Sequence, residues 1–195
     1  DKLVRIFPIH EHSICKGVAM KLYVARHGQT QYNLEKRICG RADVPLTKRG
    51  IMQAHELAEI MKPYSVDKII ASPAKRARDT AVIVGRAVGA DVIFDDRLFE
   101  RDFGDTDGTP EATPGFQHQF EQFAYQYPNG ESLLRVVQRI YNFLDEVKFK
   151  YQDQNIMIIS HGGVCRVIHS YFNSEDNREF FDFFLENAKV MEYDI

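Results

Sequence analysis

The sequence predicts an α/β domain built around a mainly parallel β-sheet. Three short apolar segments read as strands buried on both faces, and segments with apolar residues at helical spacing follow them. Strand and helix alternating along a chain require crossover connections, which place successive strands parallel in one sheet. The chain has 195 residues, of which 44% are hydrophobic and 27% charged, so it is long enough to bury one substantial core.

The buried strands are expected at residues 21–26, 66–72 and 155–160, whose sequences are KLYVAR, VDKIIAS and NIMIIS. Each is short and apolar, as expected of a strand covered on both faces of a sheet. Two weaker segments, DVIFDD at 91–96 and KVMEYD at 189–194, are expected to be strands nearer the sheet edges.

The helices between these strands are expected to begin at polar capping residues. Thr47 is predicted to cap a helix whose apolar positions, at helical spacing, are Met52, Leu57, Ile60 and Met61. Ser72 is predicted to cap the next helix, with Pro73 at its first position and Arg76 at its fourth. That helix is expected to end near Gly89.

Two further helices and one irregular region complete the prediction. A long helix is expected over 131–149, where apolar residues repeat at Leu133, Val136, Ile140, Leu144 and Val147. A shorter helix, GGVCRVIHSYF, follows the strand at 155–160. Residues 104–128 are rich in glycine, proline, threonine and aromatic residues, so we expect them to depart from regular layering and to form a lid.

Charge and composition exclude several classes of protein. The formal net charge of −3 gives no bulk attraction to nucleic acid or to an anionic membrane, and no apolar run reaches the length of a membrane span. Three scattered cysteines argue against a disulfide framework and favour a cytoplasmic location. We interpret Cys39 and Cys165 as small buried packing residues. The sequence does not indicate the oligomeric state.

Residues 1–19 precede the first strand and lack the long apolar centre of a secretory signal. We expect them to be an upstream extension, with Met20 as the natural start and residues 20–195 as a single domain. The possible metal ligands in this extension are His10, His12 and Cys15. Because no fourth ligand is evident, we interpret the extension as an idle tail.

Basic side chains follow the three buried strands, at the point where each strand ends. Arg26 and His27 follow the first strand and His161 follows the third. Arg76 lies in the helix after the second strand. Ligands bind at the carboxyl ends of strands in an open parallel sheet, so these side chains are expected to meet at one edge. These side chains, together with the free N–H groups of helix N-termini such as that at Gly162, would form a pocket for a dianion. Phosphate is the dianion that suits this pocket best.

A phosphate pocket that contains two histidines suggests covalent catalysis. One imidazole can attack phosphorus if a hydrogen bond fixes its other nitrogen as N–H, while the second imidazole and the arginines stabilise the transferring group. Glu100, at a turn near the same edge, is the best candidate to protonate the leaving oxygen and then activate water. Each residue alone could be an ordinary surface or turn residue, so only the combination favours catalysis. The absence of a P-loop sequence and of a helical zinc-type histidine pair disfavours P-loop nucleotide binding and metallohydrolases.

These motifs resemble the histidine phosphatase superfamily, also called phosphoglycerate-mutase-like, from Met20 to about Ile168. ARHGQTQYN looks like the nucleophile motif, SPAKRARDTA like the segment of the second arginine, LFERDFG like the proton-donor segment, and IISHGG like the second-histidine motif. The resemblance implies a three-layer α/β/α sandwich and a phosphohistidine intermediate, with no required metal and no other cofactor.

The resemblance also implies a role for each matching residue. His27 would be the phosphorylated histidine and Glu100 the proton donor. The other positions that the family places around the phosphate correspond to Arg26, Asn33, Arg37, Arg76 and His161.

The segment from Asp102 to Leu134 indicates the branch of this family. It contains no lysine or arginine, and it is expected to repel a second phosphate because its acidic residues are Asp102, Asp105, Asp107, Glu111, Glu121 and Glu131. This favours the broad-specificity branch, which includes alpha-ribazole phosphatase-like enzymes. In FGDTDG, Thr106 and Asp107 stand where many relatives carry Trp-Glu before the glycine, so the exact substrate is left open.

The sequence therefore predicts a phosphomonoester hydrolase that acts on a small phosphorylated metabolite. A phosphoglycerate mutase-type phosphotransferase is the first alternative, and basic residues in the 102–134 segment would have favoured it. A non-catalytic phosphate-binding module is the second alternative, but such a module usually loses the nucleophile or the acid. Neither nucleic acid nor a membrane is expected as a partner.

Overall fold

The computed structural model describes residues 20–195, which form an α/β fold around a five-stranded sheet. The strand order is β3-β2-β4-β1-β5, and all neighbouring strands are parallel except β1 and β5. All five strands occur where the sequence predicted them, and the two weaker segments, β3 and β5, form the sheet edges. The strands are β1 (Lys21–Arg26), β2 (Lys68–Ala71), β3 (Asp91–Phe94), β4 (Ile156–Ser160) and β5 (Val190–Asp194).

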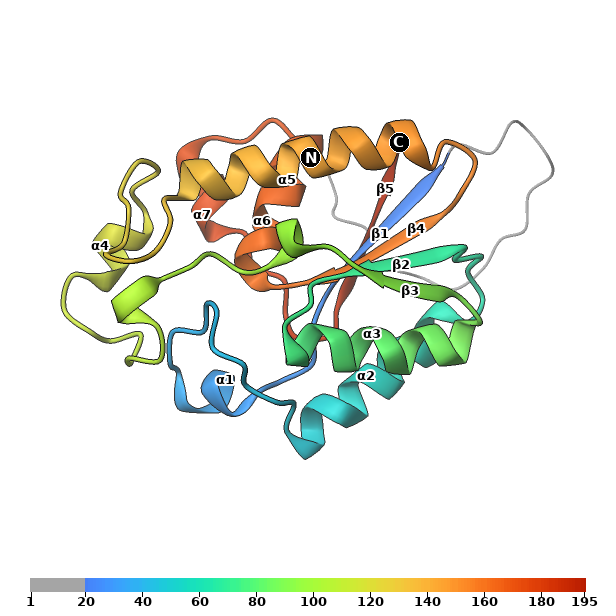
Figure 1. Ribbon diagram of the computed structural model, residues 1–195, viewed down its shortest axis with the longest axis horizontal. Helices are drawn as coiled ribbons and strands as arrows, with labels where there is room; N and C mark the ends of the chain where they lie inside the picture. Colours follow the sequence, from blue (N-terminus) through green and yellow to red (C-terminus); the bar gives the residue numbers. More distant parts are fainter. Residues whose placement is uncertain (1–19) are drawn as a thin grey trace.

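Helices cover both faces of the sheet, which confirms the three-layer sandwich (Figure 1). One face carries α2 (Lys48–Met61) and α3 (Lys75–Val88), and the other carries α5 (Leu133–Lys150) and α6 (Gly162–Phe172). The shorter elements are α1 (Gln31–Glu35), α4 (Phe116–Phe120), α7 (Asn177–Asp182) and the 3₁₀ turns η1 (Asp96–Leu98) and η2 (Gly104–Thr106). Within this part of the chain, no helix has the length and apolar character needed to cross a bilayer.

Alternate side chains of the central strands enter two separate hydrophobic cores. Leu22 and Val24 of β1 pack in the core beneath α5 and α6, whereas Tyr23 and Ala25 pack in the core beneath α2 and α3. The first core also contains the predicted apolar positions of α5, which are Leu133, Val136, Ile140, Leu144 and Val147. Because both faces of the central strands are buried, polar side chains are confined to the strand ends, where the candidate site lies.

Helix α2 is capped by Thr47 as predicted, but its buried face differs from the prediction. Leu57 and Met61 are buried, whereas Met52 and Ile60 are 56% and 46% exposed. Helix α2 packs closely against α3, and its other buried positions carry small residues rather than large apolar ones. These small buried residues are Gly50, Ala54 and Ala58.

Helix α3 begins later than predicted, because Ser72 does not cap it. Its N-cap position is Ala74, which makes no side-chain capping bond, so Arg76 is the second helical residue rather than the fourth. The Ser72 hydroxyl lies 2.8 Å from the imidazole Nε2 of His161, which competes for the hydrogen-bonding capacity that a cap would use. The helix ends before Gly89, as predicted.

Residues 102–131, which we call the insert, contain only η2 and α4 as regular structure. Their centre is an aromatic cluster in which Phe103, Phe116 and Tyr127 are buried together with Ile38. The Phe103 and Tyr127 rings meet edge to face with centroids 5.2 Å apart. In Figure 1, α4 of the insert lies at the end of the molecule where β1 leads toward α1. The predicted departure from regular layering is confirmed.

Candidate active site

The two histidines lie side by side at the tips of neighbouring strands. In the parallel β1–β4 pair, Arg26 is opposite Ser160, so His27 and His161 are the first residues beyond the two strands. Their ring centroids are 5.1 Å apart in an edge-to-face arrangement, and both residues are almost completely buried. The register of the sheet therefore brings together two histidines that are far apart in the sequence.

The hydrogen bonds of His27 leave a nitrogen lone pair directed into the site. Its Nδ1 lies 2.7 Å from the carbonyl oxygen of Gly28, which can only accept, so Nδ1 carries the proton. The unprotonated Nε2 accepts from Nε of Arg76 at 3.2 Å. A neutral imidazole held in this tautomer has the nucleophilic nitrogen that an attack on phosphorus requires.

His161 is held in the opposite tautomer. Its Nδ1 accepts from the same Nε–H of Arg76 at 3.2 Å, so its proton is on Nε2. That Nε2–H donates to the Ser72 hydroxyl, 2.8 Å away at the tip of β2. Arg76 thus donates one N–H to both imidazoles, and its contacts join the tips of β1, β2 and β4.

The surroundings of the two imidazoles keep them neutral. Burial lowers the pKa of His27 and of His161 well below the ordinary value of 6.5. The positive charges of Arg76 and Arg26 lower both pKa values further, because a second positive charge beside them is unfavourable. The arginines therefore prepare the site for an anion and also keep the His27 lone pair available.

Arg76 is completely buried and anchored by the loop between α1 and α2. Its Nη1 donates to the carbonyl of Ala42 and its Nη2 to that of Gly40, both at 2.8 Å. The next turn of α3 supports the same arrangement, since Thr80 donates to the Arg76 carbonyl and accepts from the Gly28 N–H. The guanidinium is therefore fixed before any ligand binds.

Arg26 has an unsatisfied donor. Its Nη1 donates to the Leu185 carbonyl at 3.0 Å, but its buried Nε has no hydrogen-bond partner among residues 20–195. The guanidinium lies next to Gly162, the first residue of α6, where the helix N–H groups lack intrahelical acceptors. An unpaired buried N–H is costly, and an anion bound between Arg26 and the α6 N-terminus would satisfy it.

Glu100 reaches the same site through α6. One carboxylate oxygen accepts from the Gly163 N–H at 2.9 Å, and the other accepts from the Arg101 N–H at 2.9 Å. A side chain at position 163 would collide with this carboxylate, because a Cβ there would lie 2.5 Å from Oε1. The Ser160 hydroxyl donates to the Leu98 carbonyl at 2.7 Å and so ties the segment before Glu100 to the tip of β4.

The two remaining predicted residues lie further from the histidines. Asn33 accepts from the Asn187 amide, which also donates to the His27 carbonyl, so Asn33 borders the site through one intermediate residue. Arg37 donates through Nε to the Gly108 carbonyl at 2.6 Å and stacks on the Tyr32 ring. Its hydrogen bonds thus connect it to the insert rather than to the imidazoles.

Sequence reasoning missed Asp107 as part of this site. Its carboxylate accepts from the N–H groups of Gly40 and Ala42, both at 2.8 Å. The carbonyls of these two residues hold Arg76, so Asp107 orders the loop that positions the guanidinium. The sequence did mark this position, because Thr106 and Asp107 in FGDTDG replace the Trp-Glu pair of many relatives. We interpreted that difference only in terms of substrate choice.

The structure offers no metal site among the residues that it describes. The possible metal ligands His10, His12 and Cys15 lie outside those residues. Cys39 and Cys165 are both free thiols. Cys165 is buried as predicted, and burial raises the pKa of its thiol, but Cys39 is only half-buried.

A model of the histidine phosphatase superfamily (branch 1) matches residues 22–195. The phosphatase PhoE of Bacillus subtilis strain 168, described as uncharacterized, is 32% identical over 155 residues, which are 78% of this chain and 77% of PhoE. A probable phosphoglycerate mutase GpmB of Salmonella choleraesuis is 34% identical over 150 residues, 73% of this chain and 70% of GpmB.

Solved structures resemble the fold over most of its length. A putative alpha-ribazole-5′-P phosphatase from Escherichia coli K-12 superposes with a TM-score of 0.80 at 26% identity, covering 90% of both chains. A mycobacterial glucosyl-3-phosphoglycerate phosphatase in complex with VO3 superposes with a TM-score of 0.79 at 29% identity, covering 89% of this chain and 92% of the other.

Proposed function

The chain belongs to the histidine phosphatase superfamily, and on that premise we propose that it hydrolyses phosphomonoesters of small metabolites through a phosphohistidine at His27. The observation that carries this proposal is the neutral imidazole of His27, whose Nδ1–H is anchored on the Gly28 carbonyl while Nε2 faces Arg76. No other arrangement of the two ring nitrogens satisfies both neighbours, so the nucleophilic atom is defined before substrate binds.

In the first step, Nε2 of His27 forms a bond to phosphorus as the bond from phosphorus to the ester oxygen breaks. Glu100 gives its proton to that oxygen, so the alcohol leaves neutral. We assign Glu100 this role because its carboxyl group is buried beside the start of α6. In the second step Glu100 takes a proton from water, the hydroxide oxygen bonds to phosphorus, and inorganic phosphate leaves His27.

Arg26, Arg76 and His161 are assigned to stabilising the transferred phosphoryl group. The unpartnered Nε of Arg26 supports its assignment to a phosphate oxygen. Arg76 is held by backbone carbonyls at both Nη atoms, so its Nε–H already points between the two imidazoles, where a phosphate oxygen can accept it. We also assign Gly162 to phosphate binding through its N–H, and Asn33 and Arg37 to the border of the pocket. Such preorganised donors supply most of the rate acceleration in phosphoryl transfer.

A phosphoglycerate mutase-type transfer is the second candidate, because a relative at 34% identity is described as a probable phosphoglycerate mutase. A mutase has to hold a doubly phosphorylated sugar acid, and the segment 102–134 provides no lysine or arginine for the second phosphate. A non-catalytic phosphate-binding module ranks third, because both the nucleophile and the acid are present. The small phosphorylated substrate and the cytoplasmic location remain our proposals, the latter supported by the free thiols.

Trapping the intermediate tests this function. During turnover of a ³²P-labelled aryl phosphate, we expect label on the protein that is stable in alkali, lost in acid and confined to the peptide with His27. His27→Ala should abolish the label and lower kcat at least about 10⁴-fold. His55→Ala, on the exposed side of α2, is the matched control and should keep full activity. Normal turnover by His27→Ala would reject the mechanism.

Two further measurements test Glu100 as the proton donor and distinguish a hydrolase from a mutase. Glu100→Gln should slow esters with poorly acidic leaving alcohols much more than 4-nitrophenyl phosphate, since only the former need a proton. Release of free phosphate from phosphoglycerates, without positional exchange of the phosphoryl group, identifies a hydrolase. Positional exchange that depends on a phosphorylated primer would identify a mutase instead.

A further inference from the structure

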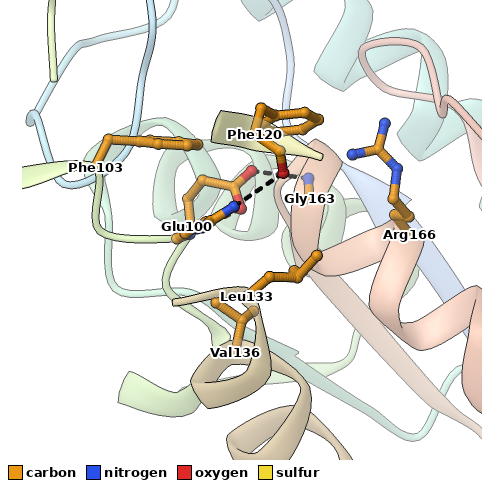
Figure 2. A pocket seen from close by; sticks show the side chains of 8 residues that line it. Glu100, Phe103, Phe120, Leu133, Val136, Gly163 and Arg166 are labelled. Carbon is orange, nitrogen blue, oxygen red and sulfur yellow. Dashed lines mark hydrogen bonds between the residues drawn. The ribbon is translucent and has the colours of Figure 1, made fainter. Parts of the chain in front are cut away.

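A pocket opens beside Glu100 and the start of α6, and no step proposed so far uses most of its lining. Figure 2 shows Glu100 and Phe103 on one side of this pocket and Arg166 of α6 on the other, with Phe120 between them. Leu133 and Val136 of α5 close it from below in that view. Since Glu100 is assigned to protonate the leaving oxygen, whatever follows that oxygen in the substrate must enter this pocket.

The lining of this pocket is mostly apolar. Phe103, Leu133 and Val136 are buried residues that also belong to hydrophobic clusters, and Phe120 packs against the aromatic cluster of the insert. Such walls favour a compact leaving group with an apolar or planar body rather than a fully hydroxylated sugar.

Two arginines also line the pocket, and they differ in their remaining hydrogen-bonding capacity. Arg101 uses all three guanidinium nitrogens on backbone carbonyls, those of Glu131, Phe120 and Tyr125. Arg166 uses only Nε and Nη2, on the carbonyls of Phe181 and Phe183. Its Nη1 has no hydrogen-bond partner among residues 20–195.

The charge of Arg166 is also uncompensated by an ion pair. No carboxylate among the described residues forms a salt bridge with it, and its guanidinium lies over the Phe120 ring, 5.2 Å from the centroid. Burial lowers the pKa of this guanidinium, and the Glu100 carboxylate opposes that shift in part. Arg166 is only half-buried and its Nη1 is not sealed in the core, so this donor is accessible to a ligand. Two observations, the free Nη1 and the missing ion pair, therefore point to an anionic ligand.

We propose that this pocket binds the leaving group of the substrate and that Nη1 of Arg166 pairs with one carboxylate on it. The proposal rests on the proposed phosphatase function. The substrate class is then a compact, partly apolar hydroxy acid phosphorylated on its hydroxyl. A second phosphate is disfavoured, because one guanidinium nitrogen offers too few donors for a dianion and the insert adds only negative charge.

Matched aryl phosphates test this inference. The probes are 4-carboxyphenyl phosphate and its neutral methyl ester, which have similar size and leaving-group chemistry. The wild-type enzyme should favour the carboxylate by about 30-fold in kcat/KM, the range expected for a charge-assisted contact. Arg166→Gln should lower kcat/KM for the carboxylate about 30-fold more than for the ester, and Arg166→Lys should restore part of the preference.

A control variant and two contrary results complete the test of Arg166. Arg178→Gln, on the exposed face of α7, removes an arginine elsewhere and should leave the preference unchanged. A wild-type preference near one, or an equal loss on both probes in Arg166→Gln, would overturn the inference, the latter by assigning Arg166 a structural role. If the wild-type protein forms the acid-labile phosphoprotein but shows no preference, only this inference fails. If it forms no phosphoprotein and hydrolyses neither probe, the proposed function fails first.

Discussion

The basic cluster at the strand tips and the insert that faces it are built on different principles. The cluster, which comprises Arg26, His27, Arg76 and His161, is attached to strand ends or to the first turn of a helix. Sheet register sets the positions of His27 and His161, whereas Arg76 is also held by the carbonyls of Gly40 and Ala42. The insert has little regular structure and is organised by a few aromatic rings around Phe103. Its acidic side chains Asp105, Glu111 and Glu121 are exposed, and it contains no lysine or arginine.

This difference separates the reaction from the choice of substrate. Groups fixed by a parallel sheet keep their positions while loops around them vary, so the phosphoryl chemistry belongs to the sheet. The insert supplies one wall of the leaving-group pocket and no positive charge from residues 102–131. The two regions meet at Asp107 and at Arg101, so substitutions there and on either side can establish how independent they are.

Among the substitutions that test this comparison, the largest effect is expected for Arg76→Lys in the cluster. A lysine keeps the charge but cannot donate to the imidazoles and to the Gly40 and Ala42 carbonyls at the same time. We expect kcat/KM to fall about 10³-fold, which corresponds to about 4 kcal/mol of transition-state stabilisation. Steady-state kinetics with an aryl phosphate measure it. A loss of less than about tenfold in kcat/KM would show that the simultaneous hydrogen bonds of the Arg76 guanidinium are not required.

The second largest effect is expected for Phe116→Ala in the insert, where the substitution should mainly lower the stability of the insert. Phe116 is buried in the aromatic cluster, so its truncation is expected to cost about 3 kcal/mol. If the two regions are independent, amide hydrogen exchange should accelerate in the insert and stay slow in β1 and β4. Equal acceleration in the strands would show that the insert and the sheet unfold as one unit.

The sequence predicted the cluster well because its information is local. Each apolar run ends at the residue that carries the chemistry, and β1 with β4 then brings His27 and His161 together by register. The same locality explains the errors. Ser72 has the signature of a helix cap, but its hydroxyl interacts with His161, 89 residues away. The spacing of Met52 and Ile60 does not reveal that α3 covers a different face of α2.

The insert was less predictable because its contacts are long-range and backbone-mediated. Asp107 binds N–H groups in the loop at 40–42, and a carboxylate acting on backbone donors leaves no pairing pattern in the sequence. Likewise, Arg166 is recognisable as exceptional only when its hydrogen bonds are compared with those of Arg101. The sequence indicated where the reaction occurs but not which groups orient its arginine or receive the leaving group.

Acid should destabilise the fold through the cluster rather than the insert. Because the pKa values of His27 and His161 are lowered well below 6.5, the unfolded chain binds protons below about pH 6.5 that the native chain does not. Stability therefore rises with pH in that range and falls on acidification, by at most about 1.4 kcal/mol per pH unit for each histidine. Urea unfolding at several pH values from 7.5 to 4.5 measures the slope. His161→Gln should reduce it, and an unchanged slope would contradict the buried neutral state.

The smallest effect is expected for Asp107→Asn, which tests the connection between the two regions. An asparagine keeps one acceptor oxygen for the loop but places an amide where the second backbone N–H donates. The loop at 40–42 should then hold Arg76 less firmly, and we expect kcat to fall about tenfold, or about 1.4 kcal/mol, with KM little changed.

Asp105→Asn is the matched control, because it removes the same charge from the same segment. Asp105 is exposed, and within residues 20–195 its carboxylate accepts only from the Asn129 side chain, so its substitution should leave kcat unchanged. Asp107→Glu should recover part of the activity, since it restores both acceptor oxygens on a longer side chain. If Asp105→Asn and Asp107→Asn lower kcat equally, the effect is one of insert charge. In that case the insert influences the cluster through its electric field, and the hydrogen-bonded path from Asp107 to Arg76 is not what couples the two regions.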